Sequence, residues 1–330
     1  MTRRAYTLLC LVLTLATFSR AEERNKTWTD PEKASAEDPD FLIQGEYGVD
    51  QLGQAWGVQV VALGNGQFDA YVLKGGLPGI GWDKSKERTP LKGAREGKVV
   101  VFGATEAGLN ARISKQGLFV LRQGKKRLAR LKRIERKSPT LGAEAPSGAT
   151  ILFDGSSADA WDKGRINNGL LANNDISTKQ KFGSYQLHME FRTPYKPFAR
   201  GQGRGNSGVY HQGRFETQVL DSFGLEGKMN ETGGVYSIAD PLINACLPPL
   251  AWQTYDVDFT AAQYDASGNK TGNPRMTVKL NGIVVQNDLE LPHSTTASPL
   301  QGITEEKGPI FIQHHGNPVY YRNIWIVEKD

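Results

Sequence analysis

Cysteine is almost absent from this chain of 330 residues, which contains only Cys10 and Cys246. Cys10 falls inside a predicted signal peptide, so we expect Cys246 to be the only cysteine of the mature protein. A single thiol cannot close an intramolecular disulfide, which excludes a small scaffold held together by disulfides. An exported protein with one thiol is typical of the bacterial envelope, either periplasmic or extracellular.

Long apolar runs are also missing, apart from a short one near the N-terminus. Arg3 and Arg4, the apolar run 8–18 and the small residues of 19–21 are the three parts of a secretory signal peptide, which we predict over residues 1–21. The run is too short to span a bilayer as a stable helix. We therefore expect an exported protein with no transmembrane segment in its mature form, and a retained membrane anchor is the alternative.

Several sequence patterns that identify enzymes are absent. The run Gly-Asn-Ser-Gly at 205–208 is not a Gly-x-Ser-x-Gly elbow, so Ser207 is not expected to be a nucleophile. The Gly-rich run 75–82 lacks the Lys-Ser/Thr ending of a phosphate loop. No His-x-His or His-Glu-x-x-His spacing indicates a transition metal. The sequence therefore requires no cofactor; it leaves a divalent cation open and the metal ligands unknown.

Acidic residues are scarce in one basic stretch. Residues 122–137 contain many Lys and Arg and a single acid, Glu135, in a chain of net charge +5. One interpretation is a polyanion-binding patch. The favoured one is a solvated strand and linker, with Leu128, Leu131 and Ile134 packing inward. No aromatic residue interleaves the basic ones, so we expect no nucleic-acid partner.

The chain is rich in short β-type segments separated by Gly-containing turns, which predicts an all-β fold. We expect a flexible lead-in at 22–40, a small β domain at 41–137, a linker at 138–150 and a larger sandwich or jelly roll at 151–330. Strands are expected at 56–63, 68–73, 98–102, 118–121, 185–192, 255–260, 276–281, 283–286, 309–313 and 319–327. The dipeptide Asn281-Gly282 predicts a tight hairpin turn.

Residues 205–221 predict two neighbouring strands that carry polar groups. Glu216 and Gln218 share one face because strand side chains alternate, whereas Asp221 falls on the other face unless a β-bulge restores its phase. Gln218 occupies the place where a second in-phase carboxylate would be expected, which weakens the hypothesis of a two-carboxylate glycosidase. An ordinary polar strand is the alternative.

Two further groups could carry chemistry. Glu190 and Arg192 lie on the polar face of their predicted strand and form either a surface pair or, on a concave sheet, a pair of substrate ligands. His314 and His315 end another predicted strand and point to opposite faces, so at most one enters a given cleft. An imidazole at a strand end is a candidate acid, base or metal ligand.

A series of short segments keeps a fixed order across residues 151–327. They are Leu152–Gly155, Gly205–Tyr210, Phe215–Asp221, Gly233–Tyr236, Trp252–Tyr255, Leu280–Gly282, Gly308–Ile310 with Gln313 and His315-Gly316, and Arg322–Ile324. Together these segments resemble the bacterial 3-keto-disaccharide hydrolase family, also described as 3-keto-glucoside lyase/hydratase domains. The resemblance implies a concanavalin-like jelly roll, preceded here by the smaller β domain.

The resemblance also implies an exported enzyme that cleaves glycosides already oxidised at C3. A base removes the proton on C2, the substituent on C1 is eliminated, and water adds back. The implied catalytic candidates are Glu216, His315 and Asp221. The implied substrate ligands are Glu190, Arg192, Asn206, Tyr210, Gln218, Tyr236 and Gln313. The alternative is a non-catalytic protein that binds glycans or interacts within the envelope; hydrolase and lyase or hydratase activity stay undecided, and protein partners are unknown.

Overall fold

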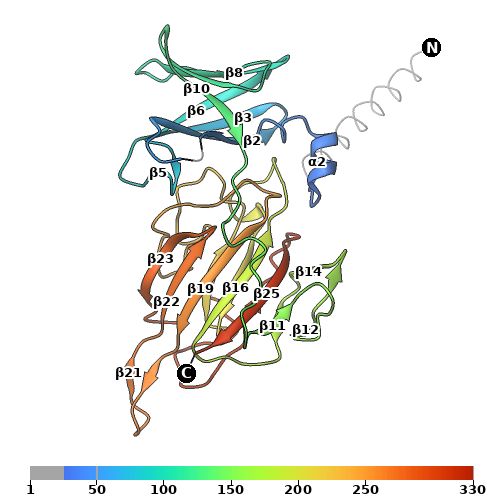
Figure 1. Cartoon of the computed structure of the whole chain (residues 1–330), viewed down its shortest axis with the longest axis vertical. Coiled ribbons are helices and arrows are strands. Elements are labelled where there is room, and N and C mark those ends of the chain that lie inside the picture. The colour runs from blue at the N-terminus through green and yellow to red at the C-terminus, as the bar shows by residue number, and fades with distance from the viewer. Residues whose placement is uncertain (1–25, 50, 330) are drawn as a thin grey trace, which may run out of the picture.

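Almost all regular secondary structure in the described residues is β-strand, as the sequence predicted. The computed structural model describes residues 26–49 and 51–329, so the predicted signal peptide lies outside the described residues. Figure 1 shows two β units along the long axis of the molecule, a barrel at one end and a larger sandwich beneath it. The basic run of the sequence belongs to the barrel, and the Glu216 segment belongs to the sandwich.

The N-terminal unit is a closed barrel with the strand order β1-β10-β9-β8-β7-β6-β3-β2. Its strands are β1 (Gly45–Gly48), β2 (Trp56–Gly64), β3 (Gln67–Lys74), β6 (Arg88–Glu96), β7 (Val99–Phe102), β8 (Leu109–Ile113), β9 (Phe119–Gln123) and β10 (Lys126–Ile134). The short strands β4 (Leu77–Pro78) and β5 (Gly81–Trp82) pair beside it. Most of the basic run is therefore strand β10, and Leu128 and Leu131 pack against the barrel core as expected.

The segment 26–40, predicted as part of a flexible lead-in, is folded onto both units. It contains helix α2 (Pro31–Glu37), which begins after Asp30, whose side chain accepts a hydrogen bond from the Lys33 amide. An Asp cap followed by Pro at the first helical position is a strong start signal that the lead-in prediction overlooked. Trp28 is buried, pairs with Tyr195 of the sandwich through the backbone, and lies 5.3 Å from its ring.

The larger unit consists of two facing sheets. The first has the order β13-β14-β25-β16-β19-β22-β23, with β11 also paired to β25, and the second has the order β12-β15-β24-β17-β18. The first contains β11 (Thr150–Phe153), β13 (Ile166–Asn167), β14 (Leu170–Ala172), β16 (Tyr185–Arg192), β19 (Gln253–Thr260), β22 (Arg275–Leu280), β23 (Ile283–Glu290) and β25 (Tyr320–Glu328). The second contains β12 (Trp161–Asp162), β15 (Ile176–Thr178), β17 (Ser207–His211), β18 (Phe215–Val219) and β24 (Phe311–Ile312).

The sandwich core lies between these sheets and follows the predicted alternation. On β16, Leu187, Met189 and Phe191 are buried in the core, and the Tyr185 ring stacks on Phe259 of β19 at 5.1 Å. The Asn281-Gly282 turn joins β22 to β23 with φ of 53° and 78°, the positive values that a two-residue hairpin needs. The insertion at 261–274 forms the hairpin of β20 (Gln263–Tyr264) and β21 (Lys270–Gly272), which projects from the end of the molecule opposite the barrel (Figure 1).

The barrel and the sandwich share apolar contacts. Leu73 of the barrel and Leu77 and Trp82 of the adjoining β4–β5 pair belong to the sandwich core, while Tyr195 and Leu250 of the sandwich belong to the barrel core. Because each core includes residues of the other unit, neither can move away without exposing buried apolar surface. The structure therefore holds the barrel against the sandwich.

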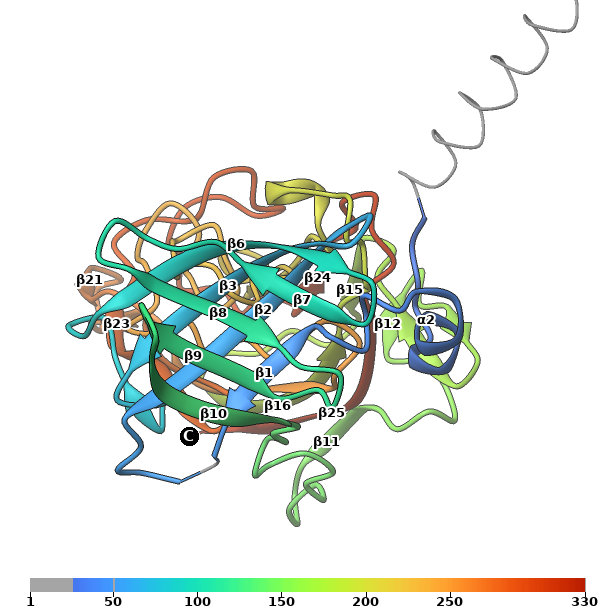
Figure 2. The ribbon, with the colours of Figure 1, turned by 90° about the horizontal axis from the view of Figure 1, so that it is seen from above.

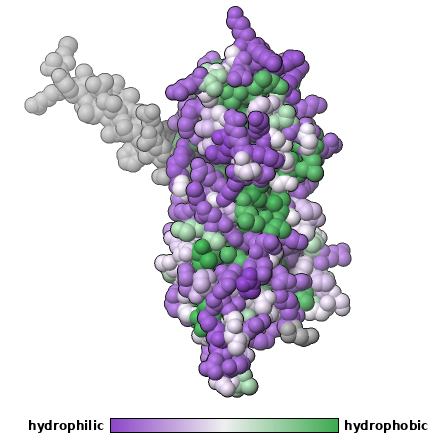
Figure 3. Space-filling model, turned by 90° about the vertical axis from the view of Figure 1, so that its left-hand side faces the viewer, coloured by the Kyte–Doolittle hydropathy of each residue, from purple (hydrophilic) through white to green (hydrophobic). Residues whose placement is uncertain are grey.

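The outer surface is mostly hydrophilic. Figure 3 shows one side of the molecule, where apolar groups gather in a few separate areas, chiefly near mid-height. Leu52, Leu242 and Leu42 are the most exposed large apolar residues, at 75%, 57% and 54%. Within residues 26–49 and 51–329, no helix combines the length and apolar character needed to cross a bilayer.

Candidate functional site

Glu216 lies on the outer face of the second sheet, where β17 and β18 run side by side. Glu216 is paired directly with Tyr210 and Gln218 with Gly208, and directly paired residues point to the same side of a sheet. Val209 and Phe215 point to the other side, into the sandwich core. The prediction that Glu216 and Gln218 share a face is therefore confirmed.

Gly208 provides the space that Glu216 occupies. A Cβ added to Gly208 would overlap the Glu216 carboxylate, so the acid side chain lies across the glycine. Any larger residue at position 208 would compete with the carboxylate for this volume. Glycine at position 208 is therefore a packing requirement of the acid on the neighbouring strand.

Burial changes the acidity of Glu216. Its side chain is 3% exposed, and desolvation raises its pKa from 4.5 to about 7, although a hydrogen bond with Tyr210 opposes this rise. The Gln313 amide donates to the Tyr210 hydroxyl at 3.1 Å, which leaves the phenolic hydrogen for Glu216. A carboxyl group with a pKa near 7 can accept and return a proton at neutral pH.

Three amide side chains lie beside the acid. Asn206 donates to Gln202 Oε1 at 3.0 Å, and Gln218 donates to the same oxygen at 3.4 Å. Among the described residues, Asn206 Oδ1 is buried without a hydrogen-bond partner, which is unusual for a buried amide oxygen. Gln202, which the sequence prediction missed, belongs to the short 3-10 helix Gly201–Gly203, and only its place in the Gly-rich run before β17 hinted at such a role.

The loop 221–244 extends the sheet next to the acid. The Tyr236 amide donates to the Glu216 carbonyl at 3.1 Å, and Val235 forms a bridge with Thr217. This pairing places the half-buried Tyr236 beside Glu216. The predicted ligands Tyr210, Gln218 and Tyr236 thus lie next to Glu216, and hydrogen bonds link Gln313 to Tyr210 and Asn206 to Gln218 through Gln202.

Asp221 does not join this cluster. Its carboxylate is 1% exposed and lies 2.6 Å from Arg204 Nε in a buried ion pair, and it also accepts a long hydrogen bond from the Phe223 amide. Desolvation raises its pKa, and Arg204 opposes that rise. Strand β18 ends at Val219, so no β-bulge within the strand turns Asp221 to the face of Glu216. Asp221 instead forms a structural ion pair with Arg204.

Glu190 and Arg192 also lie elsewhere, which corrects their assignment as ligands. Strand β16 belongs to the first sheet, and both side chains point away from the sandwich core that separates this sheet from Glu216. Glu190 pairs with Arg322 at 2.6 Å and accepts a hydrogen bond from the Gly142 amide in the linker. Arg192 lies over the ring of Trp252, 4.8 Å from its centre. Glu190 therefore fastens the linker to the outer face of the first sheet, and Arg192 contributes a contact with Trp252.

The two strand-end histidines lie in an exposed turn after β24. His315 is exposed, and its carbonyl accepts a hydrogen bond from Asn317, while the amide of His314 donates to Asp175 at 2.7 Å. Within the described part of the chain, no hydrogen bond joins the His315 ring to Glu216. A catalytic role for His315 stays a prediction. The buried histidine of this sheet is His211, whose ring contacts Tyr185 and Thr217 on the core side.

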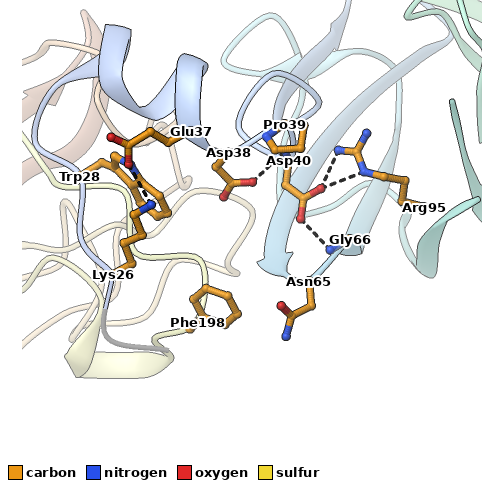
Figure 4. A pocket seen from close by; sticks show the side chains of 10 residues that line it. All are labelled: Lys26, Trp28, Glu37, Asp38, Pro39, Asp40, Asn65, Gly66, Arg95 and Phe198. Atoms are coloured by element: carbon orange, nitrogen blue, oxygen red, sulfur yellow. Dashed lines mark hydrogen bonds and ion pairs between the residues drawn. The ribbon is translucent and has the colours of Figure 1, made fainter. Parts of the chain in front are cut away.

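Two cavities lie away from Glu216, at the junction of the two units. Figure 4 shows one of about 400 Å³ between α2, the β2–β3 turn and Phe198. Its polar side chains pair with each other: Asp40 binds Arg95, and Trp28 Nε1 donates to Glu37 at 3.0 Å. These contacts leave little unsatisfied polarity for a ligand, so we attribute them to anchoring the N-terminal segment. Among the described residues, no group of three or more His, Cys, Asp or Glu is arranged to hold a metal ion.

Comparison with known proteins identifies the sandwich. A model of the family described as the 3-keto-alpha-glucoside-1,2-lyase-like domain matches residues 148–327. The chain belongs to this family. One crystal structure of a presumed glycosyl hydrolase from Parabacteroides distasonis ATCC 8503 is 36% identical, with a TM-score of 0.51 over 56% of this chain and 85% of that one. Another from the same organism is 22% identical, with a TM-score of 0.42 over 56% and 94%.

No curated protein matches this chain. Family membership confirms the resemblance seen in the sequence, and the paired sheets confirm the predicted sandwich that follows a smaller β unit. The matched residues include the whole Glu216 cluster and leave out the barrel. The barrel is therefore an addition to the lyase-like domain of this chain.

Replacing Gly208 by alanine is expected to lower kcat/KM on a glycoside substrate by about 100-fold. A displacement of about 1 Å in a reacting group can reduce a rate by that factor. The new methyl group would displace the Glu216 carboxylate, the flexible end of a side chain, so the fold should persist. Gly103→Ala is the matched control, because its added Cβ meets only an ordinary contact with Lys92 in the barrel. A wild-type rate in Gly208→Ala, with melting as in wild type, would contradict this role for Glu216.

Replacing Lys84 by methionine should loosen the loop that carries Tyr236. Lys84 reaches from the barrel and donates to the carbonyls of Gly227 and Pro241 at 2.8 and 2.6 Å. Without these bonds we expect hydrogen exchange across 224–241 to increase and kcat/KM to fall by about tenfold. Lys84→Arg should restore part of the rate. Lys86→Met is the control, because the Lys86 ammonium group donates to Gly81 and pairs with Asp83 within its own turn. Unchanged hydrogen exchange across residues 224–241 in Lys84→Met would show that Lys84 does not hold this loop in place.

Proposed function

We propose that this chain is a carbohydrate-active enzyme that cleaves 3-keto-glycosides, with Glu216 as the base. One observation carries the proposal: a buried carboxyl group with a pKa of about 7, hydrogen-bonded to Tyr210 and surrounded by amides, inside the matched lyase-like domain. A base for a carbon-bound proton should be partly ionised near neutral pH and shielded from water. Glu216 meets both requirements.

The 3-keto group makes the proton on C2 acidic. The Glu216 carboxylate takes this proton, and the C–H electron pair becomes the C2=C3 bond of an enolate whose charge is on the C3 oxygen. The enolate then reforms the ketone as its electrons expel the oxygen on C1, and the departing alcohol takes up the proton held by Glu216. Addition of water across the resulting C1=C2 bond yields the 3-keto sugar, so the overall reaction is hydrolysis.

The neighbouring polar groups have matching roles. Asn206, Gln202 and Gln218 can bind sugar hydroxyls and the enolate oxygen through their amides, which is the electrostatic part of such a reaction. Tyr210, held by Gln313, orients the Glu216 carboxyl group and limits the rise of its pKa. His315 is the remaining candidate for a second acid, and it would act on a bound substrate without contacting Glu216 directly. We further infer from the signal-peptide pattern that the reaction takes place after export.

Turnover of an oxidised disaccharide tests the proposal. Purified protein is incubated with 3-keto-trehalose or 3-keto-lactose, and 3-keto-glucose is measured between pH 5 and pH 9. We expect product, with kcat/KM rising as the pH increases through about 7, because only ionised Glu216 can act as a base. Absence of turnover with several 3-keto-glycosides, together with binding of unoxidised glycans, would favour the non-catalytic glycan-binding alternative.

A further inference from the structure

The barrel carries the charge of this protein. Residues 41–137 contain 18 Lys and Arg against 8 Asp and Glu, a surplus of +10, whereas the whole chain has a net charge of +5. The rest of the chain is therefore acidic overall. Strands β7, β8, β9 and β10 contain no aspartate or glutamate at all. Such segregation in one unit indicates a role in recognition, because net charge governs association and not the fold.

The strand register gathers these cations on one face. Arg112 of β8 and Arg130 of β10 are both paired with Val120 of β9, so the two arginines flank one valine on the same side of the sheet. The inward side is occupied by buried Ala111 and Leu121, so this row points outward. Val120 is 8% exposed, which we attribute to cover by the apolar stems of the arginines.

A second basic row lies next to the first. Arg122 of β9 and Arg127 of β10 face each other directly, and Lys132 follows Arg130 two residues further along β10 on the same side. Like charges directly opposed on neighbouring strands destabilise a sheet, so stability alone does not favour this arrangement. Among the described residues, none of these five cations, Arg112, Arg122, Arg127, Arg130 and Lys132, forms a salt bridge.

The position of this face makes it accessible. Figure 2 shows β7, β8, β9 and β10 side by side at the end of the molecule that is turned away from the sandwich. Neighbouring strands are about 5 Å apart, so the cations act together within the screening length of about 8 Å at physiological salt. An extended polymer with closely spaced anionic groups fits such a face better than a single small anion does.

We propose that the face of Arg112, Arg122, Arg127, Arg130 and Lys132, the basic barrel face, binds an anionic polysaccharide with carboxylate or sulfate groups. Carbohydrate is favoured over nucleic acid because no aromatic residue on β8 or β10 offers a platform for bases. The adjoining unit belongs to a 3-keto-alpha-glucoside-1,2-lyase-like family, so a glycan partner suits both units. The barrel would then hold the protein at an acidic glycan.

Binding to immobilised polysaccharide tests the proposal on the intact protein. Alginate supplies carboxylates, dextran sulfate supplies sulfates, and neutral dextran is the blank; affinity is measured by interferometry at 50 and 150 mM NaCl. We expect binding to at least one of the two charged polymers, weakening with salt, and no binding to dextran. The double variant Arg112→Ser with Arg130→Ser should bind about tenfold more weakly, because two cation–anion contacts are lost.

The matched control removes two positive charges from the sandwich. Lys179→Ser with Lys181→Ser changes two exposed lysines there and should leave affinity unchanged. Equal weakening in both double variants would overturn the proposal, because only net charge would then matter. Failure to bind either charged polymer at both salt concentrations, or tighter binding to single-stranded DNA or phosphatidylglycerol vesicles, would also overturn it. None of these measurements depends on catalysis, so the proposed enzyme activity and this proposal can fail separately.

Discussion

Glu216→Gln is expected to lower kcat on a 3-keto-glycoside by a factor of about 10² to 10⁴, the usual contribution of a general base. The amide keeps the size of the side chain and its contact with Tyr210, but it cannot take a proton from C2. The variant should therefore fold and still bind substrate. Glu305→Gln is the control, because Glu305 is an exposed acid of the same type. A rate within twofold of wild type in Glu216→Gln would place the chemistry elsewhere.

The same substitution should change how stability depends on pH. The folded state raises the pKa of Glu216 from 4.5 to about 7, so it binds the proton more tightly than the unfolded chain does. The acid therefore favours folding at low pH, and this advantage is lost as the pH rises from 4.5 through about 7. Relative to wild type, Glu216→Gln should gain unfolding free energy over this window, on the order of 3 kcal/mol. Urea unfolding at pH 5 and pH 8 measures the difference.

Arg204→Met should destabilise the protein by about 3–5 kcal/mol, the cost of leaving one member of a buried ion pair alone. Arg204 is 6% exposed, and its partner Asp221 is 1% exposed, so water cannot replace the lost guanidinium. Desolvation already raises the pKa of Asp221, and without Arg204 it should rise further. Arg204→Met should therefore lose less stability relative to wild type at pH 5 than at pH 8, as measured by urea unfolding.

A second substitution separates structure from catalysis at this pair. Combining Arg204→Met with Asp221→Asn removes both charges and should recover part of the lost stability, with activity retained in the folded protein. Arg165→Met, which removes an exposed arginine, should change stability by less than about 0.5 kcal/mol. If Asp221 is catalytic, the double variant will fold yet lose turnover as severely as Glu216→Gln.

The sequence predicted which residues share a strand face but not which faces share a site. Alternation placed Glu216 with Gln218 and Glu190 with Arg192, and the structure has both pairs as predicted. Alternation could not predict how the two sheets pack on each other, because strands in either sheet of a sandwich have the same two-residue period. Only the packed structure shows that the core separates Glu190 from Glu216.

Long-range partners were the other source of error. Asp221 meets an arginine on the segment before β17, and Glu190 meets Arg322 on β25, contacts that no local spacing reveals. The Asp-Pro start of α2 and the glutamine of the 3-10 helix were visible in the sequence. Short polar segments, however, have similar sequence patterns whether they are flexible or packed against another part of the fold.

By itself the sequence determined the local structure: the strands, the positive φ of the Asn281-Gly282 turn and the common face of Glu216 and Gln218. These features follow from steric limits within a few residues of the backbone. The tertiary structure alone decided the chemistry. It buried Glu216 and so raised its pKa to about 7, paired Asp221 with Arg204, and aligned arginines of three strands on one barrel face. Desolvation and charge depend on which segments pack together, and distance along the chain does not specify that.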